Sequence, residues 1–170
     1  MPRYLALLTL TVAVFSAGCS TPAATDAGSA PVSSGAAPSG AAVHDGRSIE
    51  ITADDTMKFN VTEITAKRGE KLSVTLVNLG TTPKFSMGHN WVLLALDTDL
   101  QQFAVAAAEA VTTEYVPANK DRIVAATKLL GPKERATVTF AAPGTPGRYP
   151  FLCSFPGHYQ VGMRGVLIVG

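Results

Sequence analysis

Short runs in which apolar residues alternate with polar ones fill the chain after residue 45, and they limit its fold more than any other feature. In Lys71–Asn78, for example, Leu72, Val74 and Leu76 occupy every second position. An apolar period of two is typical of β-strands that are buried on one face. Strands of this kind are therefore expected around Ile49 and Ile51 and at Lys71–Asn78 and Ala136–Phe140. Further strand candidates are Asn90–Leu96, Arg148–Cys153 and Arg164–Val169. Because turn-forming residues separate these runs, the sequence predicts an all-β antiparallel sandwich or barrel.

One segment departs from this alternation. In Thr98–Val111 the apolar residues fall three or four positions apart, at Leu100, Phe103, Ala107 and Val111. This spacing is typical of a helix that buries one face, and Thr98 or Asp99 suits the N-cap position. We therefore expect one short helix packed outside the sheets.

The first eighteen residues predict an export signal. A positive charge at Arg3 precedes an apolar run, Leu5–Phe15, and small residues follow directly before Cys19. The run is shorter than the about 20 residues that a helix needs to cross a bilayer, which favours a signal peptide over a permanent membrane helix. Its end, Ala17–Cys19, resembles the lipobox of bacterial lipoproteins, in which the cysteine thiol carries a diacylglycerol. Ser16 departs from that pattern, which usually has an aliphatic residue there.

Residues 20–43 are almost entirely Ala, Gly, Ser, Thr and Pro, with Asp26 as the only charge. A segment of this composition cannot bury a core and is typical of flexible linkers. The sequence therefore predicts a signal peptide at 1–18, a lipid-anchored disordered tether at 19–44 and a folded domain at 45–170. This organisation indicates a lipoprotein on the periplasmic side of a bacterial membrane, with soluble periplasmic secretion as the alternative.

Charge and cysteine content narrow the possible functions. The chain has 14 Lys and Arg against 13 Asp and Glu, and no basic cluster that would bind the phosphates of a nucleic acid. It has two cysteines, Cys19 and Cys153. If Cys19 carries lipid, Cys153 has no partner for an intramolecular disulfide, and its presence in an exported protein needs another explanation. A Cys19–Cys153 disulfide is the alternative, but it would join the leader boundary to a buried strand end.

The segment that carries chemistry follows the expected strand at Arg148–Cys153. Cys153, His158 and Met163 place a thiolate, an imidazole and a thioether within one loop, and His89 supplies a second imidazole upstream. Two histidines, a cysteine and a distant methionine form the ligand set of a blue-copper site. Sulfur ligands favour Cu(I) and imidazole serves both oxidation states, so this set suits reversible one-electron transfer.

These segments give the chain a specific resemblance to the cupredoxins, and among them to azurin and the auracyanins. Met87–Leu93 and Cys153–His158 are similar nearly residue for residue to the two azurin ligand segments, and the similarity extends from Ile49 to the C-terminus. The resemblance implies a Greek-key cupredoxin β-sandwich or barrel that binds one type 1 copper ion. The copper ligands that it implies are His89, Cys153 and His158, with Met163 as the weak axial ligand.

The resemblance also implies roles for three neighbouring residues. The backbone carbonyl of Gly88 approaches copper from the side opposite the axial ligand. Asn90 joins the two ligand loops by hydrogen bonds, and the backbone N–H of Phe155 donates to the Cys153 sulfur. Such contacts hold ligands in place and tune the metal.

A docking surface for redox partners is expected around the exposed edge of His158. Met87, Phe155 and Pro156 form an apolar patch there in this interpretation, with Leu79 as a further member. Apolar patches of this kind mark interaction sites.

The sequence departs from the azurin pattern in two places. Met163 follows His158 by five positions, where the corresponding interval in azurins is four, and this longer interval resembles that of auracyanin or plastocyanin. Gly162 is the residue expected to accommodate the longer loop. The disulfide that azurins carry away from copper is also missing, because no cysteine lies between Cys19 and Cys153.

The expected function is the shuttling of single electrons between redox proteins that dock transiently on a monomer, with no small-molecule substrate. Periplasmic copper buffering or delivery is the alternative, but it usually comes with Met-rich or His-rich tracts, which this sequence lacks. An enzyme with Cys153 as nucleophile and His158 as base would need an orienting group that the loop between them does not supply. We therefore expect an electron-transfer protein and not an enzyme.

Overall fold

The computed structural model describes residues 46–170. The predicted signal peptide at 1–18, the tether at 19–44 and the predicted lipid-bearing Cys19 lie outside the described residues. Within 46–170, no helix is both long enough and apolar enough to cross a membrane.

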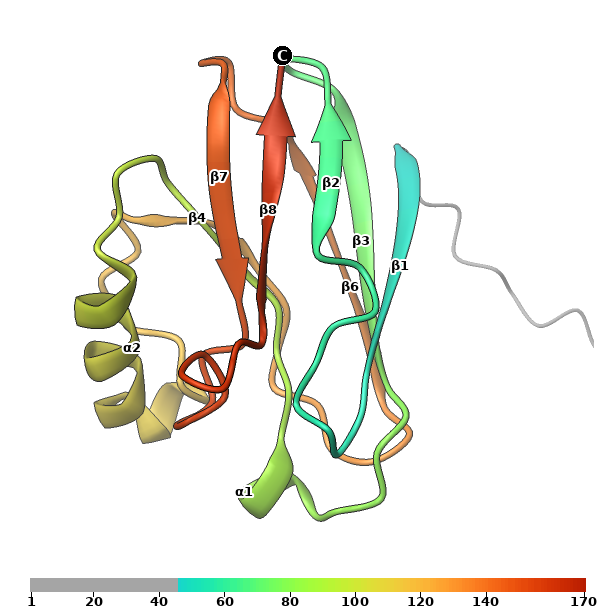
Figure 1. Cartoon of the computed structure of the whole chain (residues 1–170), viewed down its shortest axis with the longest axis vertical. Coiled ribbons are helices and arrows are strands. Elements are labelled where there is room, and N and C mark those ends of the chain that lie inside the picture. Colours follow the sequence, from blue (N-terminus) through green and yellow to red (C-terminus); the bar gives the residue numbers. More distant parts are fainter. Residues whose placement is uncertain (1–45) are drawn as a thin grey trace, which may run out of the picture. The chain divides into compact units, whose positions relative to one another are not determined.

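The described residues form eight strands in two sheets (Figure 1). The smaller sheet has the order β1 (Arg47–Ala53), β3 (Lys71–Asn78) and β6 (Arg135–Ala141); the larger has the order β2 (Glu63–Ala66), β8 (Arg164–Val169), β7 (Gly147–Leu152), β4 (Val92–Leu94) and β5 (Ile123–Ala126). The pairs β1–β3 and β2–β8 are parallel, and the other four pairs are antiparallel. The all-β fold is confirmed. Each sheet is mixed, not purely antiparallel, because β1 pairs in parallel with β3 and β2 pairs in parallel with β8.

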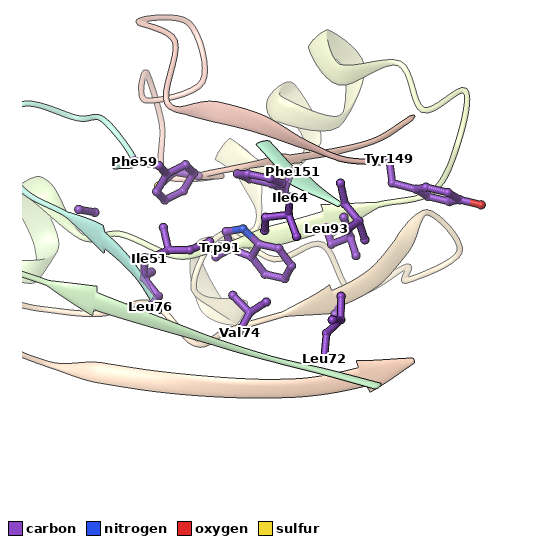
Figure 2. Packing of buried hydrophobic residues seen from close by; sticks show 14 of the residues in the cluster. Ile51, Phe59, Ile64, Leu72, Val74, Leu76, Trp91, Leu93, Tyr149 and Phe151 are labelled. Atoms are coloured by element: carbon purple, nitrogen blue, oxygen red, sulfur yellow. The ribbon is translucent and has the colours of Figure 1, made fainter. Parts of the chain in front are cut away.

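The hydrophobic core lies between the two sheets. Leu72, Val74 and Leu76 of β3 are fully buried, as their period-two spacing predicts. They face a cluster that includes Trp91 and Phe151, whose ring centroids are 5.5 Å apart (Figure 2). Because each large apolar side chain contributes about 1.5–3 kcal/mol when fully buried, this layer stabilises the sandwich.

The predicted helix forms outside the larger sheet as α2 (Leu100–Glu109). Its side chains Phe103 and Ala107 pack against apolar residues of β4 and β7 in a second cluster. The Asp99 carboxylate accepts a hydrogen bond of 3.0 Å from the Gln102 N–H, so Asp99 is the N-cap.

The sequence reasoning was wrong at several element boundaries. It missed β2 and β5, which have four residues each, and the one-turn helix α1 (Lys84–Met87). It extended the helix to Val111, which instead begins the 3-10 turn η1 (Val111–Thr113) and is 61% exposed. The strand expected at Asn90–Leu96 is limited to β4, because the backbone on either side of Val92–Leu94 does not continue the ladder.

Both segments that carry the predicted ligands lie at one end of the sandwich. His89 lies between α1 and β4, while Cys153, His158 and Met163 lie in the connection between β7 and β8. Figure 1 shows α1 and the β7–β8 connection at the same end of the domain. The sheets therefore bring together residues that are more than sixty positions apart in the sequence.

Candidate metal centre

Backbone pairing fixes the position of His89. Its N–H donates to the Leu130 carbonyl at 3.1 Å, and its carbonyl accepts from the Leu130 N–H at 2.7 Å. Directly before it, a Cβ on Gly88 would come within 2.7 Å of the Lys84 carbonyl oxygen and 2.9 Å of the Leu129 side chain. Glycine at position 88 thus allows α1 and the Leu129 segment to pack closely against the backbone that carries the imidazole.

The second ligand segment folds back on itself. The Cys153 N–H donates to the Met163 carbonyl at 3.1 Å, and the Met163 N–H donates to the His158 carbonyl at 2.9 Å. Gly157 and Gly162 have φ values of +86° and +92°, a region that favours glycine. Gly162 therefore has the conformational freedom expected of the residue that accommodates the five-residue interval.

Three of the predicted ligands converge. The ligand atoms of His89, Cys153 and His158 lie within 4.8 Å of one another, and all three residues are buried. The Cys153 sulfur is 3.4 Å from Nδ1 of His158, and the two imidazole centroids are 5.0 Å apart. Met163 is fully buried, and its backbone is hydrogen-bonded to Cys153 and His158.

The imidazole of His89 has few polar partners. Neither of its buried ring nitrogens makes a hydrogen bond of full geometry among the described residues, although the Asp54 backbone interacts with the ring and opposes the lowering of its pKa. Burying a polar group without a partner costs free energy, and native structures rarely leave one in this state. A metal ion bound between His89, Cys153 and His158 would complete the imidazole, and two nitrogens with one thiolate are a donor set that copper binds well.

Burial controls the protonation of this cluster. It raises the pKa of the Cys153 thiol to about 12, and hydrogen bonds from the backbone N–H groups of Asn90 and Phe155 oppose that shift by stabilising the thiolate. Burial also lowers the pKa of His158 to about 4, with a further contribution from the neighbouring His89. The pKa of His89 is lowered, again mainly by burial. Both imidazoles are therefore neutral near pH 7, whereas a metal must displace the thiol proton.

Residues 47–170 match the model of the plastocyanin/azurin family of copper-binding proteins. The chain belongs to this family. It is a cupredoxin that binds copper and transfers electrons, and not an enzyme.

Curated relatives and solved structures agree with this assignment. The azurin of Pseudomonas chlororaphis is 36% identical over 125 residues, which cover 71% of this chain and 96% of that azurin. Outer membrane protein H.8 of Neisseria meningitidis is 38% identical over 110 residues, which cover 64% of this chain and 60% of H.8. Auracyanin A of Chloroflexus aurantiacus, a blue copper protein, matches with a TM-score of 0.65 and 32% identity over 72% of this chain and 98% of its own.

The side chain of Asn90 joins the two ligand segments of this cupredoxin, as its resemblance to azurin implied. Its Oδ1 accepts from the Ser154 N–H at 2.8 Å, and its Nδ2 donates to the Ser154 Oγ at 2.8 Å. The same Nδ2 lies 3.4 Å from the Glu114 carbonyl, and the Ser154 hydroxyl donates to the Tyr115 carbonyl at 2.6 Å. A third segment, around Glu114 and Tyr115, therefore supports the site. Sequence reasoning missed this segment, because a contact between residues 39 positions apart depends on the fold.

The carboxylate of Glu114 anchors that third segment. It accepts from the Lys84 ammonium at 2.6 Å and from the Leu129 N–H at 3.2 Å, so it contacts both segments that flank His89. These two contacts, with the Lys84 hydrogen bond the larger cause, lower the pKa of Glu114. Glu114 and Tyr115 both have positive φ, at 56° and 64°, a conformation that these contacts must maintain.

The position of Phe155 corrects the expected docking patch. Phe155 is only 8% exposed, because its ring packs between those of Tyr115 and His158 at centroid distances of 5.0 and 4.7 Å. His158 itself is 3% exposed, so only a small part of its imidazole reaches the surface. Phe155 therefore supports His158 from inside and adds little to an exposed patch.

Exposed apolar residues nevertheless occur on the segments that adjoin the site. Pro156 is exposed, Met87 is half-buried and Leu79 is 50% exposed. Phe85 on α1, which sequence reasoning did not select, is 81% exposed. A large aromatic side chain left in solvent four residues before His89 is a signal that the sequence alone could not supply, because exposure depends on the fold.

The ion pair of Glu114 yields a pH-dependent prediction. A carboxyl group with a lowered pKa in the folded state contributes stability above its unfolded pKa, and this contribution is lost as the pH falls through the folded value. At pH 7 the parent should therefore unfold at higher denaturant concentration than Glu114→Gln. The difference should shrink between about pH 5 and pH 3, where Glu114 becomes protonated and resembles Gln.

Denaturant unfolding of the metal-free protein at several pH values measures this effect. Glu63→Gln is the matched control, since the Glu63 carboxylate is 3.9 Å from Arg148 in a more exposed pair. We expect it to change the pH dependence less. A difference between parent and Glu114→Gln that stays constant from pH 7 to pH 3 would contradict the role given to this ion pair.

Proposed function

We propose that His89, Cys153 and His158 hold one type 1 copper ion, with Met163 as a weak axial ligand and the Gly88 carbonyl opposite it. The observation that carries this proposal is the convergence of the ligand atoms of three buried residues, two imidazoles and one thiol, within 4.8 Å of one another. The complete burial of Met163 in the same loop supports its axial role.

Copper bound there would supply the change between Cu(I) and Cu(II) by which one electron is stored and released. The protein contributes a fixed and nearly dry environment. His89 and Cys153 are fully buried, and backbone hydrogen bonds hold both ends of the Cys153–Met163 loop. The N–H groups of Asn90 and Phe155 stabilise negative charge on the Cys153 sulfur. Ligands held in this way need to move little between oxidation states, which favours rapid electron transfer.

Burial also favours electron transfer over copper buffering or delivery. A delivery protein must release its ion to a partner, and exposed ligands make that exchange possible. Here His89 and Cys153 have no exposed surface, and only 3% of His158 is exposed. An electron can pass through the thin layer of protein that covers His158. The copper ion, in contrast, could leave only if the Cys153–Met163 loop opened.

Redox partners dock transiently at the site end in this proposal. We define the docking surface as Pro156, Met87, Phe85 and Leu79, which are exposed or half-buried apolar residues on the segments that adjoin the proposed ligands. Apolar patches mark interaction sites, and transient electron-transfer complexes use small interfaces, so these residues can form the apolar centre of such an interface. The electron would pass between the partner and the metal centre through the His158 imidazole.

The chain is exported in this proposal, and a lipid on Cys19 holds it at the periplasmic side of a bacterial membrane. The signal-like segment 1–18 and the linker composition of 20–43 support this location. The similarity to outer membrane protein H.8 is consistent with export. The tether at 19–44 would let the domain reach partners while it stays near the membrane.

Replacement of Cys153 tests the copper site. The protein loaded with one equivalent of Cu(II) should show an intense blue band from charge transfer between thiolate and copper, together with a narrow hyperfine splitting in the EPR spectrum. Cys153→Ser should lose both signals, because a hydroxyl oxygen cannot replace the thiolate in this transition. Met163→Leu is the matched variant, and it should keep the blue band while shifting the EPR parameters. A colourless parent complex would contradict the proposal.

Replacement of Cys19 tests the location. Cells that express the parent should hold it in the membrane fraction with a covalently attached fatty acid, whereas Cys19→Ser should move to the soluble periplasmic fraction. Ser20→Ala is the control, because it leaves the lipid-accepting thiol in place. Cell fractionation with radioactive palmitate labelling measures both effects. Equal membrane association of the Cys19→Ser variant and the parent would exclude a lipid anchor at this residue.

A further inference from the structure

The connection between β1 and β2 reaches across to the loop that carries the metal ligands. The Lys58 ammonium, at the exposed end of its side chain, donates a hydrogen bond to the Val161 carbonyl. Val161 lies within the interval between His158 and Met163, which is one residue longer than in azurins. Lys58 is 103 positions away in the sequence, so this contact is entirely a product of the fold.

The ammonium lies at the point where the ligand loop turns toward Met163. Backbone hydrogen bonds within the loop run from the Val161 N–H to the Gly157 carbonyl at 3.2 Å and from the Gly162 N–H to the Tyr159 carbonyl at 2.9 Å. Gly162, with φ +92°, follows the clamped carbonyl, and a Cβ on it would be 3.1 Å from the Lys58 nitrogen. Lys58 therefore holds the peptide group that joins Val161 to Gly162, immediately before Met163.

Neighbouring contacts also hold the backbone segment from which the Lys58 side chain extends. The Asp55 carboxylate accepts hydrogen bonds from the Thr81 N–H at 3.0 Å, the Thr81 hydroxyl at 2.9 Å and the Thr82 N–H at 3.3 Å. Phe59, next to Lys58, is buried and contacts the Phe151 ring at a centroid distance of 5.9 Å. The β1–β2 connection thus contacts the segment that leads to α1 and His89 on one side and the segment that leads to Met163 on the other.

We propose that Lys58 is a positioning residue for Met163. By fixing the Val161 carbonyl, its ammonium sets the path of the chain through Gly162 and hence the approach of the thioether to the other ligands. This inference rests on the proposed axial role of Met163 and adds the residue that compensates for the longer loop. A lysine side chain is flexible, and here its amine is held by a carbonyl acceptor, so loss of the donor leaves the loop less restrained.

The test compares Lys58→Gln with Lys133→Gln in the copper-loaded full chain. Lys133 is a matched control, because its ammonium also donates to a backbone carbonyl, that of Leu79 at 2.6 Å, but outside the ligand loop. Lys58→Gln should change the EPR hyperfine splitting and release copper to a chelator about fivefold faster, the effect of losing one hydrogen bond of typical strength. Lys133→Gln should match the parent, and Lys58→Arg, which keeps a charged donor, should restore most of the parent behaviour.

Amide hydrogen exchange in the metal-free protein gives a second measurement that needs no copper. The amides of Val161, Gly162 and Met163 should exchange faster in Lys58→Gln than in the parent and in Lys133→Gln. The inference is overturned if Lys58→Gln and Lys133→Gln agree in EPR parameters, copper release and exchange rates. A parent that shows no blue band would instead contradict the ligand assignment itself, so failure of the two proposals can be told apart.

Discussion

The hydrogen bonds between Asn90 and Ser154 are the interaction on which the metal centre depends. They join residues 64 positions apart, each directly after a proposed ligand, so His89 and Cys153 are held by their immediate neighbours. The Glu114 and Tyr115 carbonyls complete the same network from a third segment. Because buried polar groups without partners cost free energy, such a network stabilises one arrangement of the ligand loops and disfavours others. The core of the sandwich, with Trp91 directly after Asn90, keeps that network away from water.

The sequence was sufficient to predict those features that follow from local pattern or from short motifs. Period-two alternation located β3 with its observed limits, because this strand places a row of apolar residues against the core. The further strand candidate Arg164–Val169 coincides with β8. Polar residues before a helical pattern narrowed the N-cap to Thr98 or Asp99, and the structure assigns it to Asp99. Similarity to azurin over Met87–Leu93 and Cys153–His158 identified the proposed ligands, and the structure places the candidate donor atoms of His89, Cys153 and His158 within 4.8 Å of one another.

Other features depend on contacts that no local pattern contains. The four-residue strands β2 and β5 exist because longer neighbours offer them hydrogen bonds, and runs of this length carry little periodicity. Phe155 packs between the ring of Tyr115, which comes from another segment, and the ring of His158, which comes from the same loop. Its burial therefore could not be predicted from its position in the motif. Lys58 and Glu114 reach partners 103 and 30 positions away through flexible side chains, and only the folded chain shows where these side chains end.

In the proposed function, the fold sets the arrangement of the copper ligands before the metal arrives. Crystal structures of the metal-free and copper-loaded protein, determined from the same crystal form, would test it most directly. We expect the backbone of Gly88–Asn90 and Cys153–Met163 to coincide in the two structures, with the Asn90–Ser154 hydrogen bonds present in both. A metal-free structure in which these bonds are broken and the Cys153–Met163 loop takes another path would contradict the account, because the metal and not the fold would then set the geometry.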